Sequence, residues 1–221
     1  MSGRQVWEGA PYPWPHGHGS DHPTAQAAGA ETDPGLARLQ RITAPPCVAV
    51  LIGSAGSGKS SLARRAWAST QVLSLDEWRG RVSDDECDQD ATGDAPSVLL
   101  QILRVRLSRR LTTVIDATNV CFSDRQPLLQ SARAAEVPAA AIVLGTSLEA
   151  SLARNAARPG PAPGARWGRR VPEHVVRSQH RSLQGSLPSL QAEGFARIVT
   201  WPSGHEVRTA IEAPGTSPPR T

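Results

Sequence analysis

A glycine-rich stretch, GSAGSGKSS, holds the most specific chemistry in the sequence. The pattern G-x-x-x-x-G-K-[ST] is met by Gly53, Gly58, Lys59 and Ser60. In this pattern, loop N–H groups and the lysine surround phosphate oxygens, and the serine hydroxyl reaches Mg²⁺. The stretch therefore predicts a nucleoside triphosphate site. Its expected binding residues are Gly53, Ser54, Ala55, Gly56, Ser57, Gly58, Lys59, Ser60 and Ser61.

The lysine of this stretch is unusual in the chain. Lys59 is the only lysine, although the chain contains 24 Lys and Arg residues. A compact ammonium on a flexible stem fits between the β- and γ-phosphates, whereas a guanidinium is broad and planar. The other basic positions can accept arginine, and this one needs lysine. The arginine bias elsewhere can also come from genome composition and carry no functional meaning.

Two acidic residues are expected at the ends of strands. Asp76 follows the strand-like run in SLDEWRG, and Asp116 closes the one in VIDATN. Ligands of a parallel α/β sheet collect beyond the carboxyl ends of its strands, so both side chains should face the phosphate site. A carboxylate there can take a proton from an acceptor hydroxyl or hold a metal. Aspartate is also a common first residue of a loop, so spacing alone leaves both interpretations open.

Three arginines are candidates for binding anionic groups. Arg79 lies three residues after Asp76 and suits an anionic or polyhydroxy acceptor, although it could instead pair with an acidic residue of Asp84–Glu86. Arg154 and Arg158 share one helix face and precede the segment PGPAPGARWG. This arrangement predicts a lid over about residues 154–171 that brings guanidinium groups to a transferring phosphoryl group. A solvated arginine face is the alternative.

The elements that would position these residues alternate between strand and helix. Apolar, β-rich runs predict five strands at residues 47–52, 71–75, 112–115, 139–144 and 195–201. Helical spacing predicts five helices at residues 59–69, 95–110, 123–135, 147–157 and 172–187, with Ser123 and Pro172 at two helix starts. Such alternation is typical of an α/β fold with a mostly parallel five-stranded sheet sandwiched by helices.

The ends of the chain differ in composition from this middle part. Residues 1–41 are rich in Pro, Gly, Ala and His and are expected to form a disordered tail. The domain itself is expected at residues 42–205, followed by a C-terminal extension and tail at 206–221. Three histidines of HGHGSDH could hold a metal loosely, but a solvated tail is the simpler interpretation.

The sequence lacks the usual signs of secretion or membrane insertion. Its N-terminus has no apolar leader, and its apolar runs are of strand length. The three cysteines, Cys47, Cys87 and Cys121, contain no C-x-x-C pair, which favours reduced thiols. We therefore expect a cytoplasmic protein with no membrane partner. A net charge of +4 is compatible with a phosphate-rich partner.

Three segments resemble the kinase module of bacterial polynucleotide kinase-phosphatases, which are P-loop 5′-hydroxyl kinases of the AAA-type ATP-binding family. The segments are VLIGSAGSGKSSLARR, VLSLDEWRGRVSDDECDQDATGDA and LTTVIDATNVCFSDRQPLLQSAR. The likeness runs from about Pro46 to Trp201, and the stretch from Asp76 to Gly93 is far more specific than a P-loop alone. Ser74-Leu75-Asp76 stands where the bacterial module has Ser-Ser-Asp, and the lid carries a longer Pro/Gly insertion.

The resemblance implies a reaction and roles. The family phosphorylates 5′-OH ends of DNA or RNA with ATP and Mg²⁺ in a P-loop kinase-like fold. Asp76 would be the general base, and Arg79 would contact the acceptor nucleotide. ATP and its metal would be bound by Lys59, Ser60, Arg154 and Arg158. Asp116 would have a general role in the active site, near the metal. The phosphatase and ligase modules are not in this sequence, so such partners are expected on separate chains.

Two other functions use the same motifs. A kinase of this fold could act on a small hydroxyl compound such as a sugar, a nucleoside or an antibiotic. An ATP-switched binding module would hydrolyse ATP without any phosphorylated product. Asp76 and the lid arginines argue against the second of these, and the sequence does not separate DNA from RNA as the acceptor.

Overall fold

The computed structural model describes residues 33–85, 93–158, 170–202 and 205–208. All of these belong to one compact unit, Thr32–Thr221, and Met1–Glu31 form a separate unit outside the described residues. Residues 1–32 of the tail predicted for residues 1–41, and most of the predicted lid, also lie outside them.

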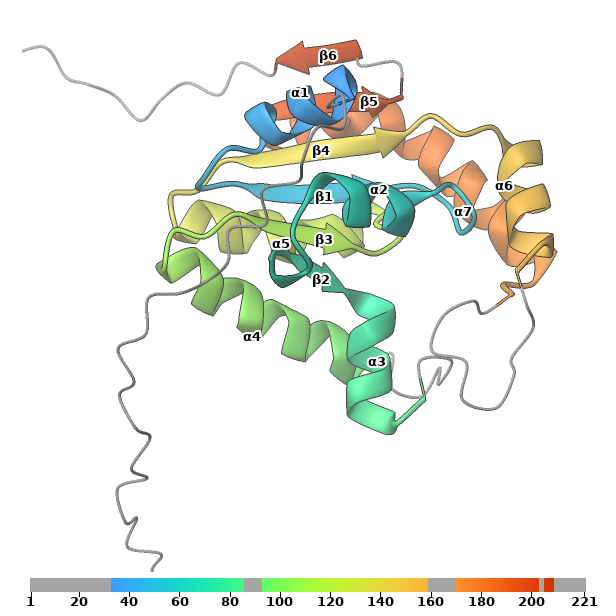
Figure 1. Ribbon diagram of the computed structural model, residues 1–221, viewed down its shortest axis with the longest axis horizontal. Coiled ribbons are helices and arrows are strands. Elements are labelled where there is room, and N and C mark those ends of the chain that lie inside the picture. Colours follow the sequence, from blue (N-terminus) through green and yellow to red (C-terminus); the bar gives the residue numbers. More distant parts are fainter. Residues whose placement is uncertain (1–32, 86–92, 159–169, 203–204, 209–221) are drawn as a thin grey trace, which may run out of the picture. The chain divides into compact units, whose positions relative to one another are not determined.

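A six-stranded sheet is the centre of this unit. Its spatial order is β2-β3-β1-β4-β5-β6, with every pair parallel except β5 and β6. The strands are β1 (Val48–Ile52), β2 (Val72–Ser74), β3 (Thr113–Asp116), β4 (Ala139–Leu144), β5 (Arg197–Trp201) and β6 (His205–Arg208). The arrowheads of β1, β3 and β4 point to one edge of the sheet (Figure 1). The predicted α/β class and its five parallel strands are confirmed.

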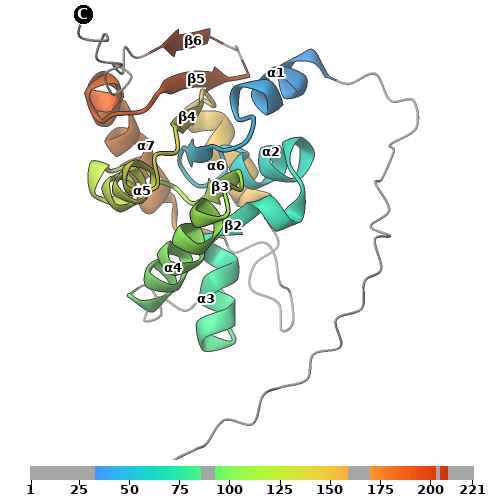
Figure 2. The ribbon, with the colours of Figure 1, turned by 90° about the vertical axis from the view of Figure 1, so that its left-hand side faces the viewer.

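Helices cover both faces of the sheet. They are α1 (Pro34–Ile42), α2 (Lys59–Ala66), α3 (Leu75–Ser83), α4 (Asp94–Ser108), α5 (Phe122–Ala134), α6 (Leu148–Ala156) and α7 (Glu173–Ser186), with short 3₁₀ turns η1 (Ser69–Gln71) and η3 (Leu187–Ala192). Turned on its side, the sheet has α4, α5 and α7 on one face and α1 and α2 on the other (Figure 2).

The central strand β1 shows why the sheet is covered on both sides. All five of its residues are buried. Val48, Val50 and Ile52 pack with leucines of α4 and α5, whereas Ala49 and Leu51 pack with α1 and α2. Alternating side chains point to opposite faces of a strand, so a continuous apolar run needs a layer of helices on each face.

Four differences from the sequence predictions have local causes. The tail predicted up to residue 41 contains helix α1, which begins at Pro34 behind the N-cap Asp33 and buries Leu39. The predicted C-terminal extension contributes β6, which pairs with the edge strand β5. Helix α5 begins at Phe122 with Cys121, not Ser123, at its N-cap.

The fourth difference concerns Asp76. Strand β2 ends at Ser74, and a helix that the sequence analysis missed, α3, begins at Leu75. The Ser74 hydroxyl accepts a hydrogen bond from the N–H of Glu77 at 3.5 Å, which caps the new helix. Asp76 therefore lies in the first turn of a helix instead of closing the strand.

Candidate nucleotide-binding and phosphotransfer site

The glycine-rich loop joins β1 to α2 at the carboxyl edge of the sheet, as predicted. Gly56 has a φ of 81° and Gly58, the N-cap of α2, has a φ of 99°, values that residues with a Cβ rarely adopt. A Cβ on Gly56 would overlap with the carbonyl oxygen of Ser151 in α6. The loop can therefore turn this tightly only with glycine at these two positions. Ser54, Ala55 and Ser57 are buried in the turn, and Ser61 on α2 is exposed.

Lys59 begins α2 and turns back over the loop. Its Nζ donates to the carbonyl oxygens of Gly53 and Ser54, both at 2.9 Å, and the side chain is 8% exposed. Burial lowers the pKa of Lys59 to about 8, although Asp116 and Asp76 act in the opposite direction and Arg158 adds to the decrease. The ammonium is thus held at the loop by carbonyl groups and surrounded by charges of both signs.

Ser60 and Asp116 form the second part of the site. Asp116 is the last residue of β3, and the Ser60 hydroxyl lies near enough to its carboxylate to favour the charged form and lower its pKa. Burial is the largest effect and raises the pKa of Asp116, and the charge of Asp76 raises it further. The Ser60 hydroxyl and the charges of Lys59 and Arg64 act in the opposite direction. A hydroxyl and a carboxylate are hard oxygen donors of the kind that Mg²⁺ prefers, and Mg²⁺ takes its remaining ligands from phosphates and water. The pair therefore fits a nucleotide-bound Mg²⁺.

A metal site built only from protein ligands is not found. Among the described residues, no three His, Cys, Asp or Glu side chains are grouped closely enough to hold a metal ion. The histidines of HGHGSDH lie outside those residues.

Asp76 faces the same region from α3. The register of the sheet places Ser74 of β2 opposite Asp116 of β3, and Asp76 follows two residues later. Its side chain is 70% exposed, yet it is close enough to raise the pKa of both Lys59 and Asp116. The structure thus places a carboxylate near the phosphate loop and leaves its side chain accessible to solvent.

Arg79 lies one turn further along α3 and forms an ion pair with Asp76. Only 14% of its side chain is exposed. Its Nε is buried and has no hydrogen-bond partner within the part of the chain that the structure describes. The arginine and the carboxylate therefore face the same position, and one guanidinium donor is left without a partner among the described residues.

Arg154 and Arg158 approach the loop from the opposite side. The Arg154 Nη1 donates to the carbonyl oxygen of Ser57 at 3.4 Å, and Arg158 lowers the pKa of Lys59. Residues 159–169 of the predicted lid lie outside the described residues, but its two ends are joined. Asn155 donates to the carbonyl oxygen of Val171 at 2.7 Å and accepts from its N–H at 3.0 Å.

Several contacts of the site were missed by the sequence analysis. The Gln179 side chain of α7 accepts from the N–H of Ala55 at 2.9 Å, and the Thr146 hydroxyl donates to the carbonyl oxygen of Ser57 at 2.8 Å. The N–H of Gly53 donates to the carbonyl oxygen of Thr118 at 3.0 Å. Gln179 and Thr146 are distant in sequence from the loop and belong to no motif, so no signal in the sequence could have found them. Thr118 lies in the VIDATN stretch, but a backbone contact leaves no signal in residue type.

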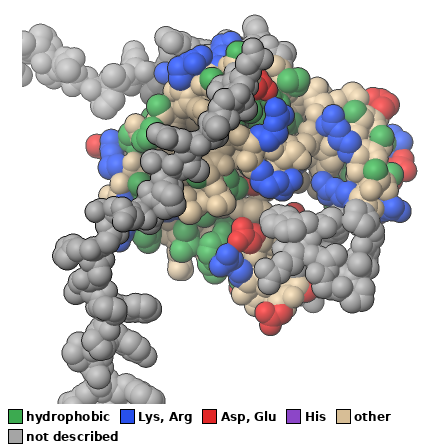
Figure 3. Space-filling view, in the orientation of Figure 1, with side chains coloured by type: hydrophobic (Ala, Val, Ile, Leu, Met, Phe, Trp, Pro, Cys, Tyr) green, Lys and Arg blue, Asp and Glu red, His purple; other side chains and the backbone are tan. Residues whose placement is uncertain are grey.

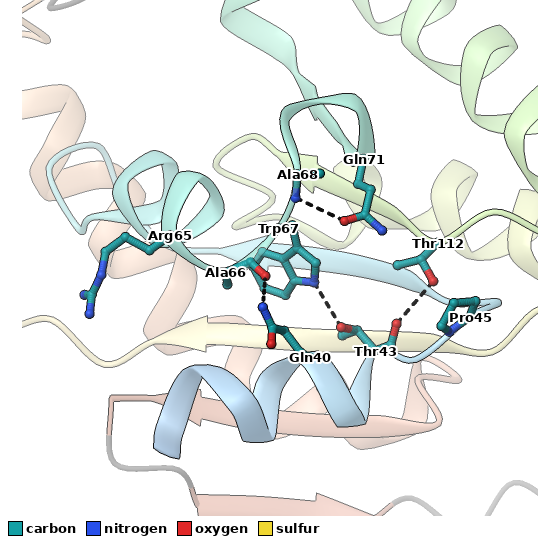
Figure 4. A pocket seen from close by; sticks show the side chains of 9 residues that line it. All are labelled: Gln40, Thr43, Pro45, Arg65, Ala66, Trp67, Ala68, Gln71 and Thr112. Atoms are coloured by element: carbon teal, nitrogen blue, oxygen red, sulfur yellow. Dashed lines mark hydrogen bonds between the residues drawn. The ribbon is translucent and has the colours of Figure 1, made fainter. Parts of the chain in front are cut away.

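The surface around the site is basic. Lys and Arg side chains gather over α2 and α6 on the face shown in Figure 3. Two separate hollows lie away from the loop. One of about 280 Å³ lies between the ends of α1 and α2 beside Trp67 (Figure 4), and one of about 560 Å³ lies between α5 and η3. In the first, Gln40, Trp67 and Thr112 hydrogen-bond to the protein itself.

This combination of fold and loop is that of a P-loop kinase-like NTPase domain. The chain belongs to the AAA domain family, whose model matches residues 48–186. No curated protein matches the chain at a significant level. Within the described residues, no helix has the length and apolar character needed to cross a membrane.

Solved structures share the fold at low sequence identity. A chain of the Pnkp1/Rnl/Hen1 RNA repair complex superposes with a TM-score of 0.55 at 17% identity, over 78% of this chain and 51% of that chain. A chain of the PezAT toxin-antitoxin system of Streptococcus pneumoniae gives 0.52 at 16% identity, over 80% and 82%. The AvrRxo1-ORF1:AvrRxo1-ORF2 complex gives 0.52 at 16%, over 79% and 61%. The chain thus spans about half the length of the first of these.

Proposed function

We propose that this domain is an ATP-dependent phosphotransferase that transfers the γ-phosphoryl group of ATP to the 5′-hydroxyl end of a DNA or RNA strand. The observation that carries the proposal is the position of Asp76. Its exposed carboxylate is within electrostatic reach of both Lys59 and Asp116, so an alcohol beside it would lie next to the phosphate loop. A carboxylate at this place can take a proton from an alcohol, and the Arg79 paired with it suits an acceptor that carries negative charge.

In the proposed reaction, each residue acts on a stated group. The Asp76 carboxylate takes the hydroxyl proton, and the freed oxygen attacks the γ-phosphorus in line as the bond to the β-phosphate oxygen breaks. Lys59 contributes positive charge between the β- and γ-phosphates, and Arg154 contributes it at the transferring group. Ser60 and Asp116 would hold Mg²⁺, which when bound neutralises phosphate charge.

Arg79 supports a nucleic-acid acceptor. It is paired with Asp76 in the free protein, and its buried Nε has no partner among the residues that the structure describes. An acceptor that carries a phosphate next to its hydroxyl would attract the guanidinium and leave the carboxylate free for the proton. The first structural relative belongs to an RNA repair complex, which agrees with this acceptor class. Phosphatase and ligase partners on separate chains would then complete a repair reaction.

The experiment that tests the acceptor is a competition assay. Phosphate from ATP labelled at the γ-position is offered to 5′-OH DNA and RNA oligonucleotides, to the same oligonucleotides already phosphorylated at the 5′ end, and to a panel of sugars and nucleosides. Labelling of only the 5′-OH oligonucleotides supports the proposal. Labelling of a small alcohol moves the acceptor to that class, and ATP consumption without a labelled product indicates a binding module.

The role of Asp76 has its own test. Asp76→Asn should keep nucleotide binding and lower the transfer rate by about 10²–10⁴-fold, as expected for loss of a general base. Glu77→Gln is the matched control, because Glu77 is the neighbouring carboxylate and pairs with Arg81 at 2.7 Å. Near-normal transfer by the Asp76→Asn protein would exclude Asp76 as the base.

A further inference from the structure

A buried ion pair lies behind the site and is not used by the proposed reaction. Arg125 of α5 has no exposed surface and is among the largest fully buried side chains of the described part of the chain. Its Nε donates to the Glu193 carboxylate at 2.7 Å, and its Nη2 donates to the other carboxylate oxygen at 2.5 Å. Its remaining nitrogen, Nη1, donates to the backbone carbonyl of Asn119 at 2.7 Å.

The third bond of Arg125 reaches the loop that follows Asp116. In this loop Asn119 adopts a φ of 48°, and its Nδ2 donates to the carbonyl oxygen of Leu51 at the end of β1 at 2.8 Å. One residue earlier, the carbonyl oxygen of Thr118 accepts from the N–H of Gly53, the first residue of the phosphate loop. The loop is thus fixed to both β1 and the phosphate loop, and Arg125 holds its far side.

A buried ion pair adds little to the free energy of unfolding by itself. Removing two charges from water costs about as much as their attraction returns, and well-packed apolar residues of similar volume often stabilise a fold equally well. What apolar residues cannot supply is a donor for the Asn119 carbonyl. The bidentate carboxylate of Glu193 fixes the plane of the guanidinium, so that its free edge points at that carbonyl.

We propose that Arg125 and Glu193 are positioning residues that hold the loop after β3 so that the Asp116 carboxylate stays beside Ser60. Neither residue is a catalytic residue. Outer contacts of this kind set the orientation of metal-binding carboxylates, and their loss typically costs about 10–100-fold in metal affinity or activity. The inference rests on the proposed Mg²⁺–nucleotide site and does not depend on which acceptor is used.

The test replaces the pair and compares it with a neighbouring contact. The Arg125→Met/Glu193→Leu protein loses both charges together, which avoids leaving one charge buried alone. Arg133→Met is the control. Arg133 also joins α5 to the residues after η3, by donating to the carbonyl oxygen of Glu193 at 2.7 Å, but it has no bond to the loop.

Three quantities are measured for each protein: the melting temperature, the affinity for a fluorescent ADP with and without Mg²⁺, and amide hydrogen exchange of residues 116–122. For the double variant we expect a folded protein with unchanged affinity for ADP alone, a loss of about 10-fold or more in the effect of Mg²⁺, and faster exchange of the loop. The Arg133→Met protein should melt earlier but keep both the Mg²⁺ effect and the slow exchange.

The outcomes separate this inference from the proposed function. Unchanged loop exchange together with an unchanged Mg²⁺ effect in the double variant overturns the positioning role. Equal changes in the Arg133→Met protein also overturn it, because they show a general loss of packing. If the unmodified protein shows no Mg²⁺ effect, the magnesium assignment fails, and loop exchange alone then decides the positioning role. If the double variant does not fold, Arg125→Gln/Glu193→Gln, which also leaves no charge buried alone, replaces it with the same readouts.

Discussion

At the scale of single residues, the chemistry of the site depends on which side chains are buried with a partner and which remain accessible. Lys59 is buried among carbonyl groups, and Asp116 is buried near the Ser60 hydroxyl, which lowers its pKa. Asp76 is exposed and paired with Arg79. Two groups are therefore prepared for a phosphate and its metal, and one carboxylate can meet an incoming alcohol.

The lysine of the loop should not tolerate arginine. In Lys59→Arg a planar guanidinium must replace an ammonium that lies within 2.9 Å of two carbonyl oxygens, and the enclosed space does not admit it. We expect the transfer rate to fall by about 100-fold or more, as for loss of a preorganised charge at a transferring phosphoryl group. Arg65→Lys, at an exposed position of the same helix, is the control and should bind nucleotide normally. Normal transfer by Lys59→Arg would show that this position does not require a compact ammonium.

The two cysteines in the described residues should differ in reactivity. Burial raises the pKa of Cys47 to about 11, whereas Cys121 is exposed. A thiol reacts as thiolate, and at pH 8 only about one in a thousand Cys47 groups would be ionised. Treatment of the native protein with iodoacetamide, followed by peptide mass spectrometry, should label Cys121 and leave Cys47 unmodified until the protein is denatured. Early labelling of Cys47 would show that β1 opens in the native state.

At the scale of elements, the phosphate loop depends on helices that come later in the chain. Helix α6 packs so closely on the loop that Gly56 has no room for a side chain, and α7 supplies the Gln179 acceptor for the N–H of Ala55. Because two distant helices hold this short loop, it is ordered before any phosphate binds. Less conformational entropy of the loop is therefore lost on binding.

This support can be measured by removing one acceptor. Gln179→Met keeps the length of the side chain but leaves the N–H of Ala55 without its partner. We expect nucleotide binding to weaken by about 1 kcal/mol, roughly fivefold, in a fluorescence titration. Gln184→Met, at an exposed position of the same helix, should have no effect. Equal affinities for the two variants would mean that α7 does not support the loop.

At the scale of the whole molecule, the folded unit extends beyond the domain boundaries predicted from the sequence. Helix α1 begins at Pro34, eight residues before the predicted start of the domain, and it packs over β1 and β5. The packing is so close that a Cβ on Gly35 would press against the ring of Trp201. Strand β6 adds an antiparallel edge after β5. The sheet is therefore covered on its α2 face by a segment that composition alone assigned to a tail.

The contribution of α1 to stability should be large for so short a helix. Leu39 is 1% exposed and lies in the same apolar cluster as Leu51 and Trp67. Leu39→Ala should lower the free energy of unfolding by about 2–5 kcal/mol, measured by denaturant titration. Arg41→Ala, at an exposed position of the same helix, should change it by no more than about 0.5 kcal/mol. Similar midpoints for both variants would mean that α1 does not unfold with the sheet.

Much of the fold could be predicted because its signals are local. The run 48–52 is apolar on both faces and can only be a covered strand, and strand β4 has the bounds predicted for it. The elements that were missed have weak local signals. Helix α3 is nine residues long, buries none of its side chains and follows β2 directly. Helix α1 has an apolar stripe, but it directly follows a segment rich in Pro, Gly and Ala, and that composition hides the helical pattern.

The sequence by itself determined the phosphate loop, the need for lysine within it, and the α/β class, because each depends on the order of neighbouring residues. Only the tertiary structure decided that Asp76 and Arg79 pair beside Lys59, that Gln179 holds Ala55, and that Arg125 and Glu193 meet behind Asn119. These contacts join residues as far as 124 positions apart, so folding, not local sequence, brings them together.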